Sequence, residues 1–226
     1  MKVKQEYFLF AAFAIVLISF ILGIWLYQSR SISIPDTFAS HWDAAGEVNG
    51  YMPKFWGLFL MPIISLIMLG LFVVLPKIDP LKKYIATFKT HYNTFILAII
   101  AFLFYIHTLT IAWNLGIRYN MIAFLSPAFA VLFYYCGILI ENSKRNWFIG
   151  IRTPWTMSSD KVWESTHKIG GKLFKAVGII SLIGLFFQEI AIFFVIVPIL
   201  LVSIYLFVYS YLEFKKENKG KIKKKK

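Results

Sequence analysis

The sequence predicts an all-α integral membrane protein with six transmembrane helices, both termini in the cytoplasm, and one interfacial amphipathic helix before the fifth span. Hydrophobic residues make up 59% of the 226 residues and charged residues 15%, whereas a soluble domain has about 45–50% apolar and about 25% charged residues. The apolar residues also come in blocks of about 20, the length that crosses a hydrocarbon core about 30 Å thick. This composition excludes an ordinary soluble fold.

Four apolar segments are each long enough for one span, and a fifth stretch has to supply two. The four single segments are 7–27, 55–76, 93–114 and 121–141. The stretch 176–212 is too long for one span and slightly short for two, and Gln188-Glu189 is the expected turn within it. The first segment is longer than the 7–15 apolar residues of a signal peptide, so we expect it to be retained as a span.

The distribution of positive charge sets the predicted orientation. The sequence has 24 Lys and Arg residues and a net charge of +13. With the N-terminus inside, three of the 24, Arg30, Lys54 and Arg118, fall outside and the other 21 fall inside. This asymmetry fits the positive-inside rule, and five spans would break it by placing the lysine-rich tail outside. Topology therefore explains the charge, and direct binding of nucleic acid is not expected.

The spans and loops divide the chain into four predicted parts. They are a cytoplasmic N-terminus (1–6), an N-terminal two-span hairpin (7–92), a four-span region (93–212) and a polybasic cytoplasmic tail (213–226). We name residues 28–54 the outer loop and residues 142–172 the inner loop. The lysines of the tail predict attraction to anionic lipid, at about 1 kcal/mol for each nearby basic residue. The one cysteine, Cys136, allows no intrachain disulfide.

The outer loop carries turn-forming residues around a titratable and aromatic group. Asn49-Gly50 is expected to form a two-residue tight turn. The pair His41-Trp42 lies between two segments that contain turn-forming Gly or Pro residues. One interpretation is an extracellular binding surface, and the other is a compact cap with aromatic anchors at the interface. The candidate binding residues are Pro35, His41, Trp42, Gly46, Gly50, Tyr51 and Lys54.

The inner loop has a more specific pattern around one arginine. Because Pro154 disfavours helix at the residue before it, a turn is expected after Arg152. Ser158 or Ser159 can then cap a helix. One interpretation is a docking surface or a lid over a cavity, and the other is an interfacial linker. The candidate residues for binding or signalling are Gly150, Arg152, Thr153, Pro154, Trp155, Thr156, Trp163 and His167.

The capped helix is predicted to be amphipathic. Trp163, His167, Gly170 and Phe174 recur at helical spacing and share one face. Charged residues occupy the other faces, so we expect this helix to lie on the inner leaflet and lead into the fifth span.

The remaining histidine of interest is His107, in the middle of the third predicted span. An ionisable group at that depth serves either a proton path or a hydrogen bond to another helix. No acidic residue lies in the middle of a span to act as its partner, which favours the hydrogen bond. The four histidines lie in separate places in this topology, so no metal or other cofactor is expected. No nucleophile and base come together either, so we do not expect an enzyme.

Two stretches resemble a known family. The run 150–156, followed by Val162-Trp163, His167 and Gly170, resembles the SdpI family of membrane proteins. The outer stretch from Pro35 to Lys54 resembles a domain of unknown function often found at the N-terminus of the same proteins. The resemblance implies a multi-span protein of a prokaryotic plasma membrane. It implies, as a class, immunity to a secreted, membrane-active peptide toxin at the outer face. The best-known family member also holds a repressor at the membrane, and the resemblance leaves open whether a cytoplasmic repressor protein is a partner of this chain.

The leading functional hypothesis is accordingly a membrane immunity and signal-transduction protein, with the lipid bilayer as its constant partner. The alternative is a small-molecule or ion transporter of unknown substrate. Pro62, Pro127 and Pro198 inside predicted spans could shape a transport cavity, together with His107. The lack of acidic residues within the spans weighs against ion coupling.

Overall fold

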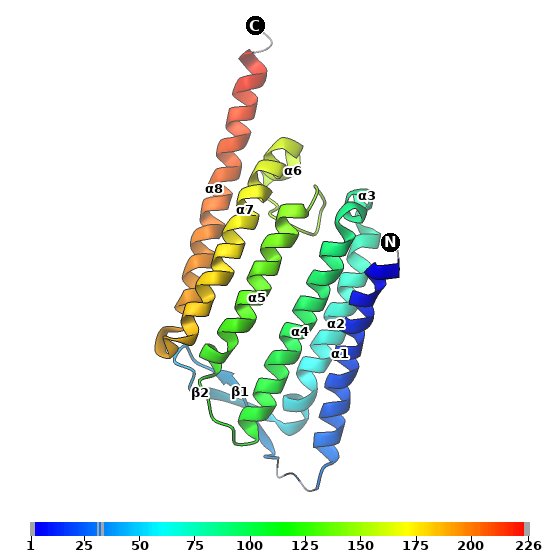
Figure 1. Cartoon of the computed structure of the whole chain (residues 1–226), viewed down its shortest axis with the longest axis vertical. Helices are drawn as coiled ribbons and strands as arrows, with labels where there is room; N and C mark the ends of the chain where they lie inside the picture. Colours follow the sequence, from blue (N-terminus) through cyan, green and yellow to red (C-terminus); the bar gives the residue numbers. More distant parts are fainter. Residues whose placement is uncertain (1–2, 31, 33, 224–226) are drawn as a thin grey trace.

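The computed structural model describes residues 3–30, 32 and 34–223, and it is mostly helical (Figure 1). Long helices lie side by side, with short elements at the two ends of the bundle. The long helices are α1 (Val3–Gln28), α2 (Lys54–Ile78), α4 (Lys89–Asn114), α5 (Met121–Asn142), α7 (Asp160–Ser181) and α8 (Phe193–Lys223). The short elements are α3 (Lys82–Ile85), α6 (Pro154–Ser158), three 3₁₀ turns (Ala86–Phe88, Leu182–Leu185 and Gln188–Ile190), and strands β1 (Thr37–Trp42) and β2 (Val48–Pro53).

Within the described residues, five helical segments are long and apolar enough to cross a membrane. They are Glu6–Gln28, Lys54–Ile78, Lys82–Asn114, Met121–Asn142 and Gln188–Gly220. The first four coincide with the four single apolar segments of the sequence. The last contains the second half of the long apolar stretch and begins at the expected Gln188-Glu189 turn. Helix α7 is not among the five because Lys and Glu residues recur along it.

Helix α7 differs from the separate interfacial helix that the sequence suggests. It runs without a break from Asp160 to Ser181 and continues as the 3₁₀ turn 182–185. Ser159 caps its start through a side-chain hydrogen bond to the Val162 N–H. The predicted face of Trp163, His167 and Gly170 is buried. The amphipathic stripe therefore packs inside the bundle, because neighbouring helices cover it.

Small residues allow α7 to approach α5 closely. A Cβ added at Gly171 would lie 2.7 Å from the Gly137 carbonyl oxygen, and one at Gly178 would lie 2.7 Å from the Ala130 carbonyl oxygen. These distances leave no room for a larger side chain. Small residues at helix contacts are typical of membrane bundles, where backbone approach and dispersion replace the hydrophobic drive of water.

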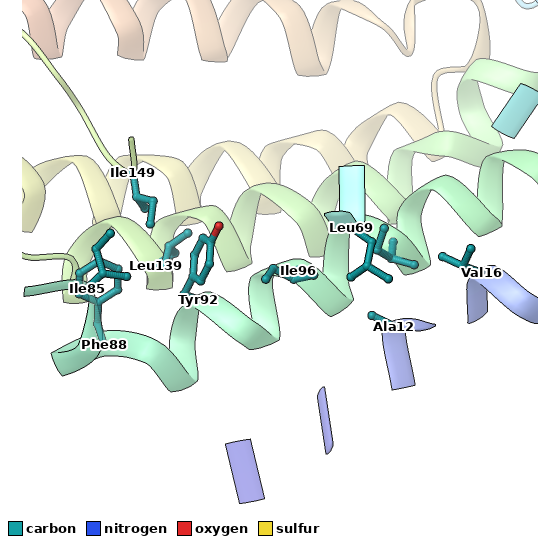
Figure 2. Close-up of a cluster of buried hydrophobic side chains, with 10 residues drawn as sticks. Ala12, Val16, Leu69, Ile85, Phe88, Tyr92, Ile96, Leu139 and Ile149 are labelled. Atoms are coloured by element: carbon teal, nitrogen blue, oxygen red, sulfur yellow. The ribbon is translucent and has the colours of Figure 1, made fainter. Parts of the chain in front are cut away.

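The helices pack as two groups that meet along α4 and α5. Helices α1 and α2 pack against α4, while α7 packs against both α5 and α8. Figure 2 shows the buried cluster, in which Ala12 of α1, Leu69 of α2 and Ile96 of α4 continue to Leu139 of α5 and Ile149 of the inner loop. The apolar core thus reaches from the first helices to the base of the inner loop.

The outer loop contains an antiparallel hairpin, which departs from a wholly α fold. The predicted tight turn at Asn49-Gly50 is wrong, because Gly50 lies within β2 and pairs with His41. The chain instead reverses between Asp43 and Glu47. There the Asp43 carboxylate accepts the N–H of Glu47 at 3.0 Å, and Gly46 adopts a φ of 86°. An aspartate that binds the backbone nearby competes successfully with an Asn-Gly pair.

The two loops lie at opposite ends of the bundle (Figure 1). The hairpin covers one end, and α3 and α6 lie at the other. Helix α1 begins and α8 ends at the end that carries the inner loop. Four of the lysines that were counted on the inner side lie outside the described residues. They are Lys2, Lys224, Lys225 and Lys226.

Candidate functional site

The backbone of the inner loop folds around one buried amide, that of Asn146. Its Oδ1 accepts the N–H groups of Phe148 and Ile149 at 2.9 and 2.6 Å. Its Nδ2 donates to the carbonyl oxygens of Lys144 and Ile149 at 2.8 and 2.9 Å. All four hydrogen-bonding positions of the amide are used, so Asn146 sets the shape of residues 144–149. No sequence pattern singles out Asn146.

A buried carboxylate ties the inner loop to the first half of the chain. Asp79, directly after α2, is 2% exposed. Its Oδ2 accepts the N–H of Trp147 at 2.9 Å, and its Oδ1 accepts the N–H of Leu81 at 2.6 Å. Hydrogen bonds to an ionised acceptor are stronger than neutral ones. Sequence reasoning missed Asp79 because its partner Trp147 lies 68 residues further along the chain.

His167 attaches the motif to α7. Its Nε2 accepts the Ile151 N–H at 2.9 Å, so this nitrogen carries no proton. Its Nδ1 donates to the Trp163 carbonyl oxygen at 2.8 Å. The ring is therefore neutral, with its proton on Nδ1. Gly150, at a φ of 113°, lies against the ring, and a Cβ there would lie 2.4 Å from Nε2. Glycine is required at this position on both counts.

The neutral state of His167 follows from its surroundings. Burial lowers the pKa of His167 to about 4, although its hydrogen bond to the Trp163 carbonyl acts in the opposite direction. The Trp163 ring stacks on the imidazole at 3.8 Å between centroids, and its Nε1 donates to the Ser143 carbonyl oxygen at 3.0 Å. Protonation of Nε2 would turn the acceptor of the Ile151 N–H into a donor. The attachment of the motif to α7 thus depends on an uncharged ring.

The two threonines of the motif fix α6 and join it to α8. Thr153 caps α6 in a capping box with Thr156, as a residue before Pro154 in extended conformation can do. Thr156 Oγ1 also donates to the Ile151 carbonyl oxygen at 2.8 Å. Thr153 Oγ1 donates to Ser210 Oγ of α8 at 3.0 Å. The turn after Arg152 is therefore closed on itself and fastened to the last helix.

Trp155 strengthens the same contact with α8. Its ring packs on Phe207 and Tyr211, with centroids 5.0 and 5.1 Å apart. The pair with Phe207 is edge-to-face, and such a pair adds about 0.5–1.5 kcal/mol beyond the area that it buries. The inner-loop motif thus bridges α7, through His167, and α8, through Trp155.

Arg152 is the motif residue whose charge is left accessible. Its side chain is exposed, and its Nη1 donates to the Trp147 carbonyl oxygen at 2.5 Å. Within residues 3–30, 32 and 34–223, the ion pairs found join other residues and none includes Arg152. The structured loop therefore presents a guanidinium with donors available for an anionic group.

A polar cleft of about 320 Å³ lies beside the loop, between Tyr84 and the start of α7. Charges of both signs line it. Arg145 pairs with Asp160 at 2.8 Å, and Lys144 lies 3.8 Å from Glu164. Exposed pairs like the second contribute little stability. The cleft has no excess of one charge that would select a small ion.

The outer hairpin is fixed to the helix ends by two asparagines. Asn114 of α4 accepts the Ala39 N–H at 2.8 Å and donates to the Ala39 carbonyl oxygen at 3.0 Å, much as a paired strand would. Asn120 donates to the Ala45 carbonyl oxygen at 2.6 Å and lies against Gly46, where a Cβ would be 2.5 Å from Asn120 Oδ1. The side chain of Phe38 is fully buried beneath the hairpin.

The candidate residues of the outer loop are less enclosed than those of the inner loop. Pro35, His41 and Tyr51 are exposed, and His41 is hydrogen-bonded to Asn49. Trp42 packs edge-to-face on Trp113 of α4, at 5.8 Å. Lys54 begins α2 and holds its ammonium group 5.3 Å from the centre of the Tyr27 ring. The outer and inner candidate sets occur at opposite ends, so they form two sites.

His107 occupies neither site. It is fully buried in α4, and its Nδ1 is hydrogen-bonded to Ser19 Oγ of α1 at 2.7 Å. Over the part of the chain that the structure describes, no group of three His, Cys, Asp or Glu side chains is placed to hold a metal ion.

Comparison with known proteins found two matching family models and one similar protein. The model of the SdpI/YfhL protein family matches residues 142–210, which contain the inner loop, α7 and most of α8. The model of a domain of unknown function, DUF1648, matches residues 14–66, which contain the outer hairpin. The chain is also 27% identical over 205 residues to the Immunity protein SdpI of Bacillus subtilis (strain 168), covering 90% of this chain and 94% of that protein.

Over these segments the chain is similar to the SdpI/YfhL family. The inner-loop motif falls in the region that the SdpI/YfhL model matches, and the two family models together match segments at both ends of the bundle. With five apolar helices among its described residues, the chain is a multi-pass protein of a bacterial plasma membrane. No solved structure matches the chain significantly.

Proposed function

We propose that the chain is an SdpI-family protein and confers immunity to a secreted peptide that attacks the bacterial membrane. One observation carries the proposal: the similarity to the Immunity protein SdpI covers 90% of this chain and 94% of that protein. The similarity therefore includes both loops as well as the helices. The site contains no paired nucleophile and base, and SdpI is not a known enzyme family. A binding and protecting role fits the site better than catalysis does.

The proposed topology has six spans with both termini in the cytoplasm. The five apolar helices supply the first four spans and the sixth. The remaining span, the fifth along the chain, consists of α7 from about Lys172 together with residues 182–190. Glycines along this segment that contact α5 support the assignment. Gly171 of α7 lies near the inner end of α5, and a Cβ added at Gly184, in the 3₁₀ turn 182–185, would lie 2.7 Å from Ser126 Oγ near its outer end. His167 and the residues before it lie beyond the spanning part.

In the proposed mechanism the outer hairpin meets the peptide and the inner loop provides the response. The exposed side chains of His41 and Tyr51 offer the peptide a surface. The exposed guanidinium of Arg152 offers an anionic group of a cytoplasmic repressor protein a partner. Coupling between the two ends requires that the helix bundle has two conformations, and that binding at either end shifts the equilibrium between them. Helix α4 supports the hairpin through Asn114, and α8 supports the motif through Trp155.

The tail is proposed to hold α8 against the inner leaflet. Helix α8 extends past the other helices at the inner-loop end (Figure 1). Lys215, Lys216 and Lys219 are exposed on this extension. Anionic lipid headgroups would attract them, and salt would weaken the attraction.

The test is deletion of the gene followed by challenge with membrane-active peptides. We expect the deletion strain to become sensitive to a cognate peptide and the wild-type gene to restore resistance. Arg152→Ala and Trp155→Ala are then compared at equal membrane abundance. Loss of resistance in both supports a role of the inner loop. Full resistance in both removes the inner loop from the mechanism, and a deletion strain without any sensitivity contradicts the immunity function itself.

A further inference from the structure

An apolar cavity lies directly beneath the inner loop, between the two groups of helices. It has a volume of about 250 Å³ and is partly open. Residues 148–151 of the inner loop cover it, and side chains of α2, α4, α5 and α7 form its walls, among them Phe72, Phe95, Cys136 and Phe174. Tyr92 contributes a hydroxyl, which already donates to the Phe72 carbonyl oxygen at 2.8 Å. No charged side chain lines the cavity.

The accessible positive charge of the motif belongs to Arg152, the residue that directly follows the covering segment 148–151. Its guanidinium donates to the carbonyl oxygen of Trp147, the residue that directly precedes that segment. Asp79, which follows α2 and accepts the Trp147 N–H, is buried and also accepts the Leu81 N–H. None of the ion pairs among the described residues includes Arg152, so an anion there would meet a guanidinium that has no carboxylate partner.

The position of the cavity indicates the kind of molecule that enters it. Trp147 is 53% exposed next to Arg152, and tryptophan in membrane proteins is enriched at the level of the lipid headgroups. An apolar space below that level and a guanidinium at it match the two ends of a phospholipid. A helix of a partner protein would need a long open groove, whereas this cavity is short and roofed by residues 148–151.

We propose that the cavity under the inner loop binds one anionic phospholipid of the adjacent leaflet, with part of an acyl chain among Phe72, Cys136 and Phe174 and the phosphate group on Arg152. The proposal rests on the cavity, the exposed guanidinium and the interfacial Trp147. It is independent of immunity to any peptide, since lipid binding is measured without one.

Lipid retention by the purified full chain tests the proposal. The chain in detergent is mixed with equal amounts of phosphatidylglycerol and phosphatidylcholine of the same acyl chains, and native mass spectrometry counts the bound lipids. We expect one phosphatidylglycerol to be retained in preference. Arg152→Gln should reduce the preference about fivefold, the factor that one basic residue near an anionic lipid contributes. Arg118→Gln, which removes a guanidinium at the hairpin end, is the matched control and should leave the preference unchanged.

The single cysteine gives a second readout that needs no change in the cavity. Cys136 is the one cysteine of the chain and lines the cavity. We expect added phosphatidylglycerol to slow the reaction of Cys136 with a membrane-permeant maleimide, and Arg152→Gln to require about fivefold more lipid for the same protection.

Two outcomes overturn the proposal. One is equal retention of both lipids by the wild type and Arg152→Gln with no protection of Cys136. The other is protection of Cys136 that increases with protein concentration, together with a dimeric mass in native mass spectrometry. That result would assign the cavity to a second copy of the chain.

Discussion

The two loops of this protein use their characteristic residues in opposite ways. In the outer hairpin, His41 and Tyr51 are exposed, and the hairpin is fixed mainly by asparagine amides of the neighbouring helices. In the inner loop, Thr156, Trp163 and His167 are at most 2% exposed and bind the backbone of their own loop or of α5's end. The first loop displays its side chains, while the second uses most of them internally.

This difference shows that a motif can be mainly a scaffold. Most motif residues of the inner loop fix the backbone between Gly150 and Pro154. The charged side chain that this backbone leaves exposed is that of Arg152. We therefore expect inner-loop substitutions to divide into those that unfold the loop and one that leaves the loop intact but removes its charge. Substitutions of the exposed hairpin residues His41 and Tyr51 should be tolerated structurally. The following predictions test this division, in decreasing order of the expected effect on stability.

Gly150→Ala should have the largest effect. The new Cβ would meet His167 Nε2 at 2.4 Å, in a backbone conformation that side chains disfavour. Backbone strain and displacement of the ring together should cost about 3 kcal/mol or more. The measurement is thermal unfolding of the purified protein in detergent. Gly70→Ala is the control, because nothing lies within 4 Å of its added Cβ, and equal effects of the two changes would contradict the structure of the loop.

Acid should weaken the inner loop through His167. Its folded pKa of about 4 lies below the ordinary value of 6.5, so protons bind the unfolded state preferentially. Stability is therefore complete above pH 6.5 and is lost as the pH falls from 6.5 to 4, by about 2–3 kcal/mol. Unfolding followed by tryptophan fluorescence at several pH values measures the loss. His167→Gln should remove this component of the pH dependence and His41→Gln should retain it, and an unchanged slope in His167→Gln would refute the assignment.

Asp79→Asn should weaken the link between the inner loop and α2. The amide keeps one acceptor oxygen but places a donor against a backbone N–H, so we expect a loss of about 1–2 kcal/mol. Asp43→Asn in the hairpin turn is the counterpart at the other end, where the carboxylate is near water, and should cost about 0.5 kcal/mol or less. Chemical denaturation of both variants makes the comparison. A larger loss for Asp43→Asn would reverse the contrast between the two loops.

Much of this fold could be predicted from the sequence because hydrophobic length is a local property. The segments 7–27, 55–76, 93–114 and 121–141 each lie within one helix or extend it by a few residues. Helix α7 was harder to assign. Its charged residues are typical of an interfacial helix, and the glycines that pack it against α5 become informative only when α5 is placed beside them.

The candidate site shows the same limit. The motif from Gly150 to Thr156 could be selected from its residues, but the bond from His167 to Ile151 depends on how α7 returns to the loop. Asp79 and Asn146 were missed because their partners are backbone N–H groups, which leave no pattern in a sequence. The Asn49-Gly50 turn was predicted wrongly because the Asp43 carboxylate shifts the reversal by several residues.

Arg152→Ala should have the smallest effect on stability, at about 0.5 kcal/mol or less for an exposed side chain, and the largest effect on function. The most direct test expresses this variant, the wild type and Arg152→Lys at equal membrane abundance in the deletion strain, and measures survival against the cognate peptide. We predict that Arg152→Ala is as sensitive as the deletion strain although its thermal unfolding is unchanged, with partial resistance in Arg152→Lys. Full resistance of Arg152→Ala would contradict the conclusion that the inner loop exists to present this guanidinium.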